Sequence, residues 1–300
     1  MSTVPFKSAQ GRSRDVVTTA AVVVTVLAWA SAFPAIRAGL AAFGPMELAA
    51  LRFTIAAIPA ALFLIVVRPG WPALTDIWRL AVGGTVFVAL YAGLLNMGEK
   101  TVSAGAASFI INVNPIITAG LAMVVLGERF SARAWAGTAL SFLGIGLIAL
   151  GEGGGLRLDT GALLILGSAF CASISTVVQK SLFSRHKPLT VSAWNMVVGA
   201  VALGPWLPNG MNEFSAASTE AIVAVVYLGI VPSLIAYGTW AIALSRLPAS
   251  RASNFMYCVP PVATLLGFLW LGEVPTPLGA IGGAMALAGV AIVNLRQKRA

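Results

Sequence analysis

The chain has 300 residues, of which 58% are hydrophobic and only 10% are charged, and its mean hydropathy is +0.91. These values exclude an ordinary soluble globular protein and place the chain in a lipid bilayer. Its two cysteines, Cys171 and Cys258, offer neither a disulfide framework nor a Cys-x-x-Cys metal site, and we expect no metal and no cofactor.

Ten apolar stretches are each long enough to cross a membrane. A hydrocarbon core of about 30 Å requires about 20 helical residues at about 1.5 Å per residue. The sequence therefore predicts an all-α polytopic membrane protein with ten transmembrane helices, at residues 16–36, 46–67, 75–97, 102–126, 132–150, 160–183, 188–207, 219–244, 249–271 and 276–295.

The first of these stretches also resembles a signal peptide. Residues 1–32 have a basic start, an apolar middle and a possible cleavage site at Ala28-Trp29-Ala30. However, Ser31-Ala32-Phe33 recurs later in the chain as Ser168-Ala169-Phe170. We therefore interpret the segment as a membrane span that is part of a repeat.

The fourth and fifth stretches carry a signature that returns 145 residues later. Pro115 is followed by Leu126-Gly127-Glu128, and Pro260 is followed by Leu271-Gly272-Glu273. The same offset pairs Ala104 with Ala249, Ala107 with Ala252, Ser108 with Ser253, Gly137 with Gly282 and Gly144 with Gly289. So many matches in one register predict a duplicated unit.

Each copy of the unit contains five predicted spans, and this odd number predicts that the copies are inverted relative to one another. Inverted repeats place a substrate site near the middle of the membrane, between the copies. The predicted domains are a cytoplasmic tail, a first repeat, a connector, a second repeat and a C-terminal cytoplasmic tail, at residues 1–15, 16–150, 151–159, 160–295 and 296–300.

The net charge of +9 has an explanation in membrane topology, so no nucleic-acid partner is expected. With a cytoplasmic N-terminus, 15 of the 19 basic residues lie in cytoplasmic segments, and the exceptions are Arg37, Lys100, Arg157 and the intramembrane Arg52. This is the positive-inside asymmetry of short loops. It predicts a multi-pass protein of the cell inner membrane with both termini in the cytoplasm.

The two proline and Leu-Gly-Glu signatures, the ten spans and the positive-inside loops together resemble the drug/metabolite transporter superfamily. Within it, the chain is most similar to EamA-type exporters, and among these to amino-acid exporters of the YddG type. The resemblance covers nearly the whole chain. It implies a basket of ten helices around a central cavity, which exports aromatic and other neutral amino acids or related metabolites.

Helix breakers within the spans are the first candidates for residues with a role in transport. We expect them to form a structural hinge. Pro115, Pro260 and Pro261 each remove a hydrogen bond to the carbonyl four residues earlier. The freed carbonyls are candidates to accept hydrogen bonds from a substrate amine. The alternative is that neighbouring helices satisfy them and the prolines only kink the helices.

Polar residues within the spans are the second group of candidates, because lipid cannot satisfy them. Ser108 and Asn112 share a helical face with Pro115, Asn254 and Tyr257 lie near Pro260, and Ser175 and Gln179 continue a polar stripe of the sixth span. Each is predicted either to line the substrate cavity or to form hydrogen bonds between helices.

Trp29 and Tyr91 are candidates to hold an apolar or aromatic solute, with core packing as the alternative. Tyr237 and Trp240 are instead predicted to belong to the aromatic belt at the membrane surface. Arg52 is a candidate to grip a substrate carboxylate, and Asn195 takes its place in the second copy. Snorkelling of Arg52 to the surface, or pairing with Glu47, is the alternative.

The spans contain no Asp, Glu or His at depth, and Glu47 and Glu99 are predicted near external ends. Facilitated diffusion or exchange by alternating access is therefore the simplest mechanism, although these carboxylates remain able to couple weakly to protons. An intramembrane enzyme is not expected, because no His-Glu-x-x-His motif or paired intramembrane Asp residues occur. A broad-specificity drug or metabolite exporter, a channel or a scaffold remain alternatives.

Small residues and the glutamates of the signatures complete the predictions. Gly279 and Gly283, and Gly137 and Ser141, allow close helix packing, either within a monomer or in a weak homodimer. Glu128 and Glu273 are predicted to have structural roles, capping neighbouring helices or pairing with basic residues.

Overall fold

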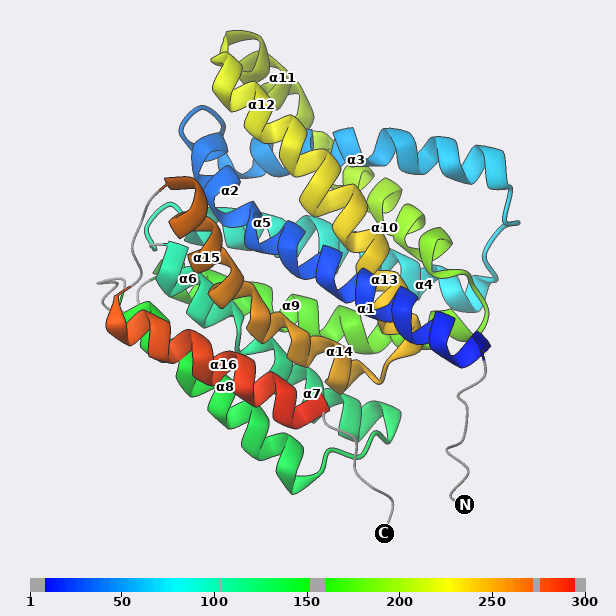
Figure 1. Ribbon diagram of the computed structural model, residues 1–300. Coiled ribbons are helices and arrows are strands. Elements are labelled where there is room, and N and C mark those ends of the chain that lie inside the picture. The colour runs from blue at the N-terminus through cyan, green and yellow to red at the C-terminus, as the bar shows by residue number, and fades with distance from the viewer. Residues whose placement is uncertain (1–8, 103, 152–159, 272–275, 295–300) are drawn as a thin grey trace.

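The computed structural model describes residues 9–102, 104–151, 160–271 and 276–294, and all regular structure within them is helical (Figure 1). The α-helices are α1 (Ala9–Ala30), α2 (Ala32–Leu40), α3 (Pro45–Val67), α4 (Leu74–Val82), α5 (Tyr91–Gly98), α6 (Ala104–Ile111), α7 (Asn114–Leu126), α8 (Ala132–Gly151), α9 (Thr160–Lys180), α10 (Pro188–Ala202), α11 (Leu207–Ala216), α12 (Thr219–Leu228), α13 (Ala236–Arg246), α14 (Ala249–Asn254), α15 (Val259–Leu271) and α16 (Pro277–Asn294). Two π-helical segments, η1 (Gly83–Leu90) and η4 (Gly229–Ile235), and three 3₁₀ turns, η2 (Ser181–Ser184), η3 (Gly204–Trp206) and η5 (Phe255–Cys258), connect them.

Eight helical stretches in the described residues are long and apolar enough to cross a membrane, or nine if α10 and the segment after it, bent by 51°, form one span. Large apolar side chains such as Val66 and Val124 are exposed on the outer faces, as contact with lipid requires. The prediction of an all-helical, polytopic membrane protein is therefore confirmed. In Figure 1, α8 and α16 lie side by side at the bottom, and α11 and α12 project at the top.

The third and eighth predicted spans share an irregularity. The third predicted span corresponds to the helical stretch from Leu74 to Gly98, which contains η1. The eighth corresponds to the stretch from Thr219 to Arg246, which contains η4. Both π-helical segments therefore begin nine or ten residues into their stretches. Single π-helical turns inside α-helices are rare and occur often at functional sites.

The signature prolines lie at breaks between helices. Helix α6 ends at Ile111, and Pro115 occupies the first turn of α7, where its missing N–H group has no intrahelical partner to lose. Pro260 likewise lies in the first turn of α15, directly after η5. Both prolines therefore lie inside their predicted spans, at points where one helix ends and a new one starts.

Helices α8 and α16 approach closely through small residues at equivalent positions of the two copies. A Cβ atom on Gly144 would lie 2.5 Å from the carbonyl oxygen of Gly282, and one on Gly282 would lie 2.4 Å from the carbonyl oxygen of Gly144. The equivalent contact joins Gly137 to Gly289, where a Cβ on Gly137 would lie 2.7 Å from the carbonyl oxygen of Gly289. Between the two contacts, the Ser141 hydroxyl donates to the carbonyl of Ala286 at 2.9 Å. Gly137 and Ser141 therefore pack inside the molecule.

The predicted Gly279 and Gly283 pair does not make this contact. A Cβ on Gly279 would meet the side chain of Thr276 in the same segment, and one on Gly283 would meet Pro261 only at 3.8 Å. The face of α16 that packs on α8 instead carries Gly282, Ala286 and Gly289.

Glu128 caps the start of α14, as one of the predicted alternatives requires. Helix α7 ends at Leu126, and the next residue, Gly127, has a φ of 65°, which favours glycine. The following Glu128 carboxylate accepts hydrogen bonds from the backbone N–H groups of Ala249 and Ser250, at 2.6 and 3.0 Å, and from the Ser250 hydroxyl. Its counterpart Glu273 lies outside the described residues.

Candidate functional site

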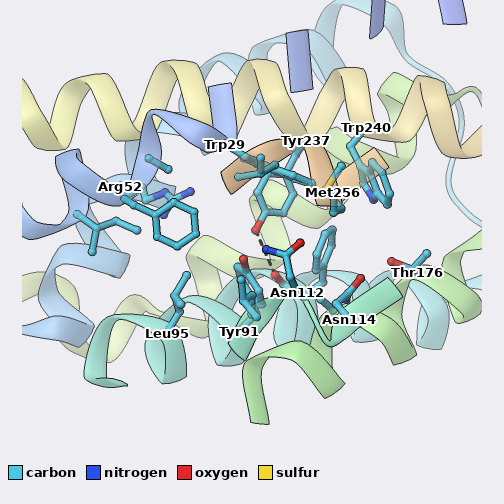
Figure 2. A pocket seen from close by; sticks show the side chains of 17 residues that line it. Trp29, Arg52, Tyr91, Leu95, Asn112, Asn114, Thr176, Tyr237, Trp240 and Met256 are labelled. Atoms are coloured by element: carbon cyan, nitrogen blue, oxygen red, sulfur yellow. Dashed lines mark hydrogen bonds between the residues drawn. The ribbon is translucent and has the colours of Figure 1, made fainter. Parts of the chain in front are cut away.

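A cavity lies between helices from both halves of the chain (Figure 2). Its wall is mainly apolar and aromatic, with one charged side chain. The lining residues are Trp29, Ala32, Phe33, Ile36, Arg52, Phe87, Tyr91, Leu95, Ile111, Asn112, Asn114, Ala172, Thr176, Tyr237, Trp240, Met256 and Val259. Figure 2 shows Arg52 and Leu95 at one end, and Trp240 and Thr176 at the other.

Five aromatic side chains pack against one another along the wall. Tyr237 is central: its ring centroid lies 4.8 Å from that of Phe87 and 5.7 Å from that of Trp29. Trp240 and Tyr91 extend the contacts, with centroids 5.5 Å from Trp29 and 5.9 Å from Phe87 respectively. The Trp29 and Tyr237 rings meet edge to face and the other pairs are tilted, and such aromatic contacts stabilise the shape of a pocket.

Hydrogen bonds to the π-helical segments hold the aromatic wall in place. The Trp29 indole N–H donates to the carbonyl of Pro232 in η4 at 3.1 Å, and the Tyr237 hydroxyl donates to the carbonyl of Phe87 in η1 at 3.3 Å. The irregular segments of the two halves therefore supply the acceptors that orient the aromatic residues.

Arg52 is a buried cation with unused donors. Its side chain is 3% exposed, its Nε donates to the Ser233 hydroxyl in η4 at 2.5 Å, and its Cζ lies 5.0 Å from the centre of the Phe53 ring. The terminal guanidinium nitrogens have no partner among the described residues. Snorkelling and pairing with Glu47 are therefore wrong, and two parallel donors remain available to a ligand.

Asn112 and Asn114 bring amide groups to the cavity from the break between α6 and α7. The Asn112 amide N–H donates to the carbonyl of Ser108 at 2.6 Å, and its buried Oδ1 has no hydrogen-bond partner among the described residues. The Asn114 amide donates to the carbonyl of Ala169 at 3.3 Å. The Asn112 oxygen is thus an acceptor that a ligand ammonium or hydroxyl group could use.

Of the ten residues predicted to bind substrate, four line the cavity: Trp29, Arg52, Tyr91 and Asn112. The amide of Asn195 donates instead to Gln179, which joins α10 to α9. Ser108 and Ser175 are buried, and neither hydroxyl oxygen has a partner among the described residues.

Asn254 and Tyr257 turn toward α8 and α16 and are not among the residues that line the cavity. The Asn254 amide donates to Thr138 of α8 at 3.1 Å. Tyr257 is fully buried in a cluster with Ile145, Ala286 and others. Although Tyr257 corresponds to Asn112 in the repeat, the two side chains therefore have different surroundings.

Several lining residues were not predicted to bind substrate, namely Phe87, Asn114, Thr176, Tyr237, Trp240 and Met256. The assignment of Tyr237 and Trp240 to a surface belt is wrong, because they are 3% and 5% exposed and line the cavity. Their spacing of three residues, which places both on one face of a helix, is the signal that could have linked them.

Glu99 lies at a span end, as predicted, but its side chain is buried inside the protein. It is the first residue after the third span, is 3% exposed, and neither carboxylate oxygen has a hydrogen-bond partner among the described residues. Burial raises the pKa of Glu99 to about 8, although the positive charges of Arg37 and Arg52 act to lower it. The group is therefore a proton-binding candidate near neutral pH.

Comparison with known proteins identifies the family. The model of the EamA-like transporter family matches residues 18–150 and, a second time, residues 159–295. The chain belongs to the EamA-like transporter family. It is therefore a membrane transporter that contains the family domain twice, and the predicted resemblance is confirmed.

Relatives over most of the chain have names that refer to export or transport. The "Probable terminal-alkyne amino-acid exporter" of Streptantibioticus cattleyicolor is 39% identical over 276 residues, covering 92% of this EamA transporter and 93% of the relative. Transporter YdfC of Bacillus subtilis is 37% identical, with 89% and 88% covered. The "Probable amino-acid metabolite efflux pump" of Salmonella typhimurium is 27% identical, with 90% and 92% covered.

A solved crystal structure has the same fold. It superposes with a TM-score of 0.74 at 22% sequence identity, and the match covers 93% of this EamA transporter and 96% of the other chain. At this identity the similarity concerns the arrangement of the helices alone.

Proposed function

We propose that this EamA transporter exports amino acids with aromatic or other neutral side chains. The observation that carries the proposal is the free end of Arg52 in a cavity lined by six aromatic side chains. A buried guanidinium with unused donors matches a carboxylate, and the aromatic wall matches an apolar side chain. The names of the relatives support the same solute class.

In the proposed complex, Arg52 binds the solute carboxylate and the Asn112 oxygen accepts from its ammonium group. Trp29 and Tyr91 contact the side chain, together with Tyr237 and Trp240. Gln179 with Asn195, and Asn254 with Thr138, join helices around the site, and Ser108, Ser175 and Tyr257 are buried outside its lining. The residues proposed to contact the solute all line the cavity, and the others do not.

We further propose that ten spans form two inverted copies, residues 16–150 and 160–295, which rock against each other around the cavity. Equivalent irregularities in the two copies and the contact between Ser141 and Ala286 support this arrangement. The helix breaks at Pro115 and at Pro260 and Pro261 act as hinges. Both termini lie in the cytoplasm, and the monomer in the inner membrane is the working unit.

A broad-specificity drug or metabolite exporter is the second candidate. It is favoured by the many apolar and aromatic residues in the lining, which would accept varied solutes without a carboxylate. The two candidates differ in whether the solute must carry a negative group for Arg52.

A competition assay in liposomes separates the candidates. The purified full chain is reconstituted, and uptake of labelled L-phenylalanine is measured against neutral, aromatic, basic and acidic amino acids and against phenylethylamine, which lacks the carboxylate. We expect neutral and aromatic amino acids to compete and phenylethylamine to fail. Equal competition by phenylethylamine would favour the drug exporter, and absence of saturable uptake would refute the amino-acid exporter.

A further inference from the structure

Glu99 is a buried carboxyl group that the proposed solute site does not use. It lies one helical turn beyond Leu95, which lines the cavity, and its backbone N–H donates to the Leu95 carbonyl at 2.9 Å. Its side chain is nevertheless 3% exposed and has no hydrogen-bond partner among the described residues. The backbone of Glu99 therefore lies one helical turn from a residue of the cavity wall, and its carboxyl group is shielded from water.

The charged groups whose fields reach Glu99 come from two helices, α2 and α3. Arg37 of α2 and Arg52 of α3 are the cations whose fields reach it, and Tyr91 lies on its own helix. Neither arginine forms an ion pair with Glu99 among the described residues. Glu47, at the start of α3, is more exposed.

The third helix beside Glu99, α9, offers no charge at this level. A Cβ atom on Gly98 would meet Ile165 and the Gly161 carbonyl of α9, and the charged residue of α9 within its described range is Lys180, at its far end. An ionised carboxylate without hydrogen bonds in such a place is strongly unfavourable, so the group takes up a proton instead.

We propose that Glu99 is a proton-binding site whose occupancy is linked to the solute carboxylate on Arg52. This inference rests on the proposed function for its solute. With the cavity empty, the positive charge of Arg52 stabilises the ionised form of Glu99. A carboxylate bound to Arg52 cancels that charge, so solute binding favours the protonated form. The proton comes from the solvent and binds a Glu99 oxygen, and no bond in the solute changes.

The sign of the pH dependence follows from this linkage. The pKa of Glu99 is raised to about 8, and a bound carboxylate raises it further. Below about pH 8 the proton is already present, so affinity for the solute is nearly independent of pH. Above about pH 8 solute binding must take up a proton, so the dissociation constant rises with pH, by at most about tenfold per pH unit for one linked proton.

Calorimetric titration of the purified full chain with L-phenylalanine, from about pH 7 to about pH 10, tests the linkage. The ammonium group of phenylalanine titrates in the same range, so Glu99→Gln supplies the reference curve. We expect wild type to lose affinity more steeply than E99Q above about pH 8, and Glu47→Gln to behave as wild type. Parallel curves for wild type and E99Q would overturn the linkage.

Infrared difference spectra of wild type against E99Q, without solute, test the proton site independently. The carbonyl stretch of a protonated carboxyl group is expected at pH 7 and should disappear toward about pH 10. Glu99→Met is a second reference if E99Q does not fold. Absence of the band at pH 7 would overturn the proposal. If the band is present but wild type binds none of the amino acids, the proposed function fails and the proton site stands.

Discussion

Arg52 is the residue on which recognition of a carboxylate depends. Hydrogen bonds that involve a charged group contribute about 1.5–3 kcal/mol, so Arg52→Gln should raise the dissociation constant for L-phenylalanine about 10- to 100-fold. Arg52→Lys should lose less affinity than R52Q, because lysine keeps the positive charge, although it lacks the two parallel donors. Equilibrium binding to the purified variants is the measurement. Unchanged affinity in R52Q would show that the solute carboxylate binds elsewhere.

The sequence predicts which types of residue form the site better than it predicts which way their side chains point. Trp29, Arg52, Tyr91 and Asn112 were predicted because a large or polar side chain inside a span needs a protein partner, whichever helix supplies it. Tyr237 and Trp240 were misplaced, because the face that a helix turns inward depends on its neighbours in space. The burial of Glu99 was hidden for the same reason, since α2, α3 and α9 surround it.

At the scale of the elements, the contact between α8 and α16 predicts different effects of substitution at two adjacent glycines, Gly282 and Gly283. Gly282→Ala places a methyl group 2.4 Å from the carbonyl oxygen of Gly144, so the helices must move apart. Gly283→Ala meets its nearest atom at 3.8 Å and is the matched control. We expect G282A to lower the melting temperature in detergent by several degrees, for a loss of about 1–3 kcal/mol, and G283A to leave it almost unchanged. Equal melting of the two variants would contradict this packing.

The cap of α14 by Glu128 predicts a local effect. In Glu128→Gln the side chain keeps one acceptor atom and loses its charge, so the first turn of α14 should open more easily, by about 1–2 kcal/mol. Hydrogen exchange should show about 5- to 30-fold faster exchange of the Ala249 and Ser250 amides. Exchange in α12, which Glu128 does not contact, is the internal control. Unchanged protection of α14 would show that the cap adds no stability.

For the whole molecule, the duplication could be predicted, because the same residue types recur with one offset and helix packing needs small residues at both places. The discontinuity of the spans could not. Pro232 lies inside η4, but η1 contains no proline, and the hydrogen bonds of both segments to Trp29 and Tyr237 join residues that are distant in the chain. The irregular segments thus became visible only in the fold, where they anchor the cavity wall.

The central claim is that two oppositely oriented copies of one unit enclose the cavity. Ser131 and Thr276 are equivalent, since their hydroxyls accept from the N–H groups of Ala134 and Gly279 at 3.2 and 3.0 Å. Single Cys variants at these positions, with Cys171 and Cys258 replaced by Ala, are labelled with a membrane-impermeant thiol reagent. In intact cells we predict labelling at position 276 alone, and in inside-out vesicles at position 131 alone. Labelling of both positions from one side would contradict the inverted arrangement.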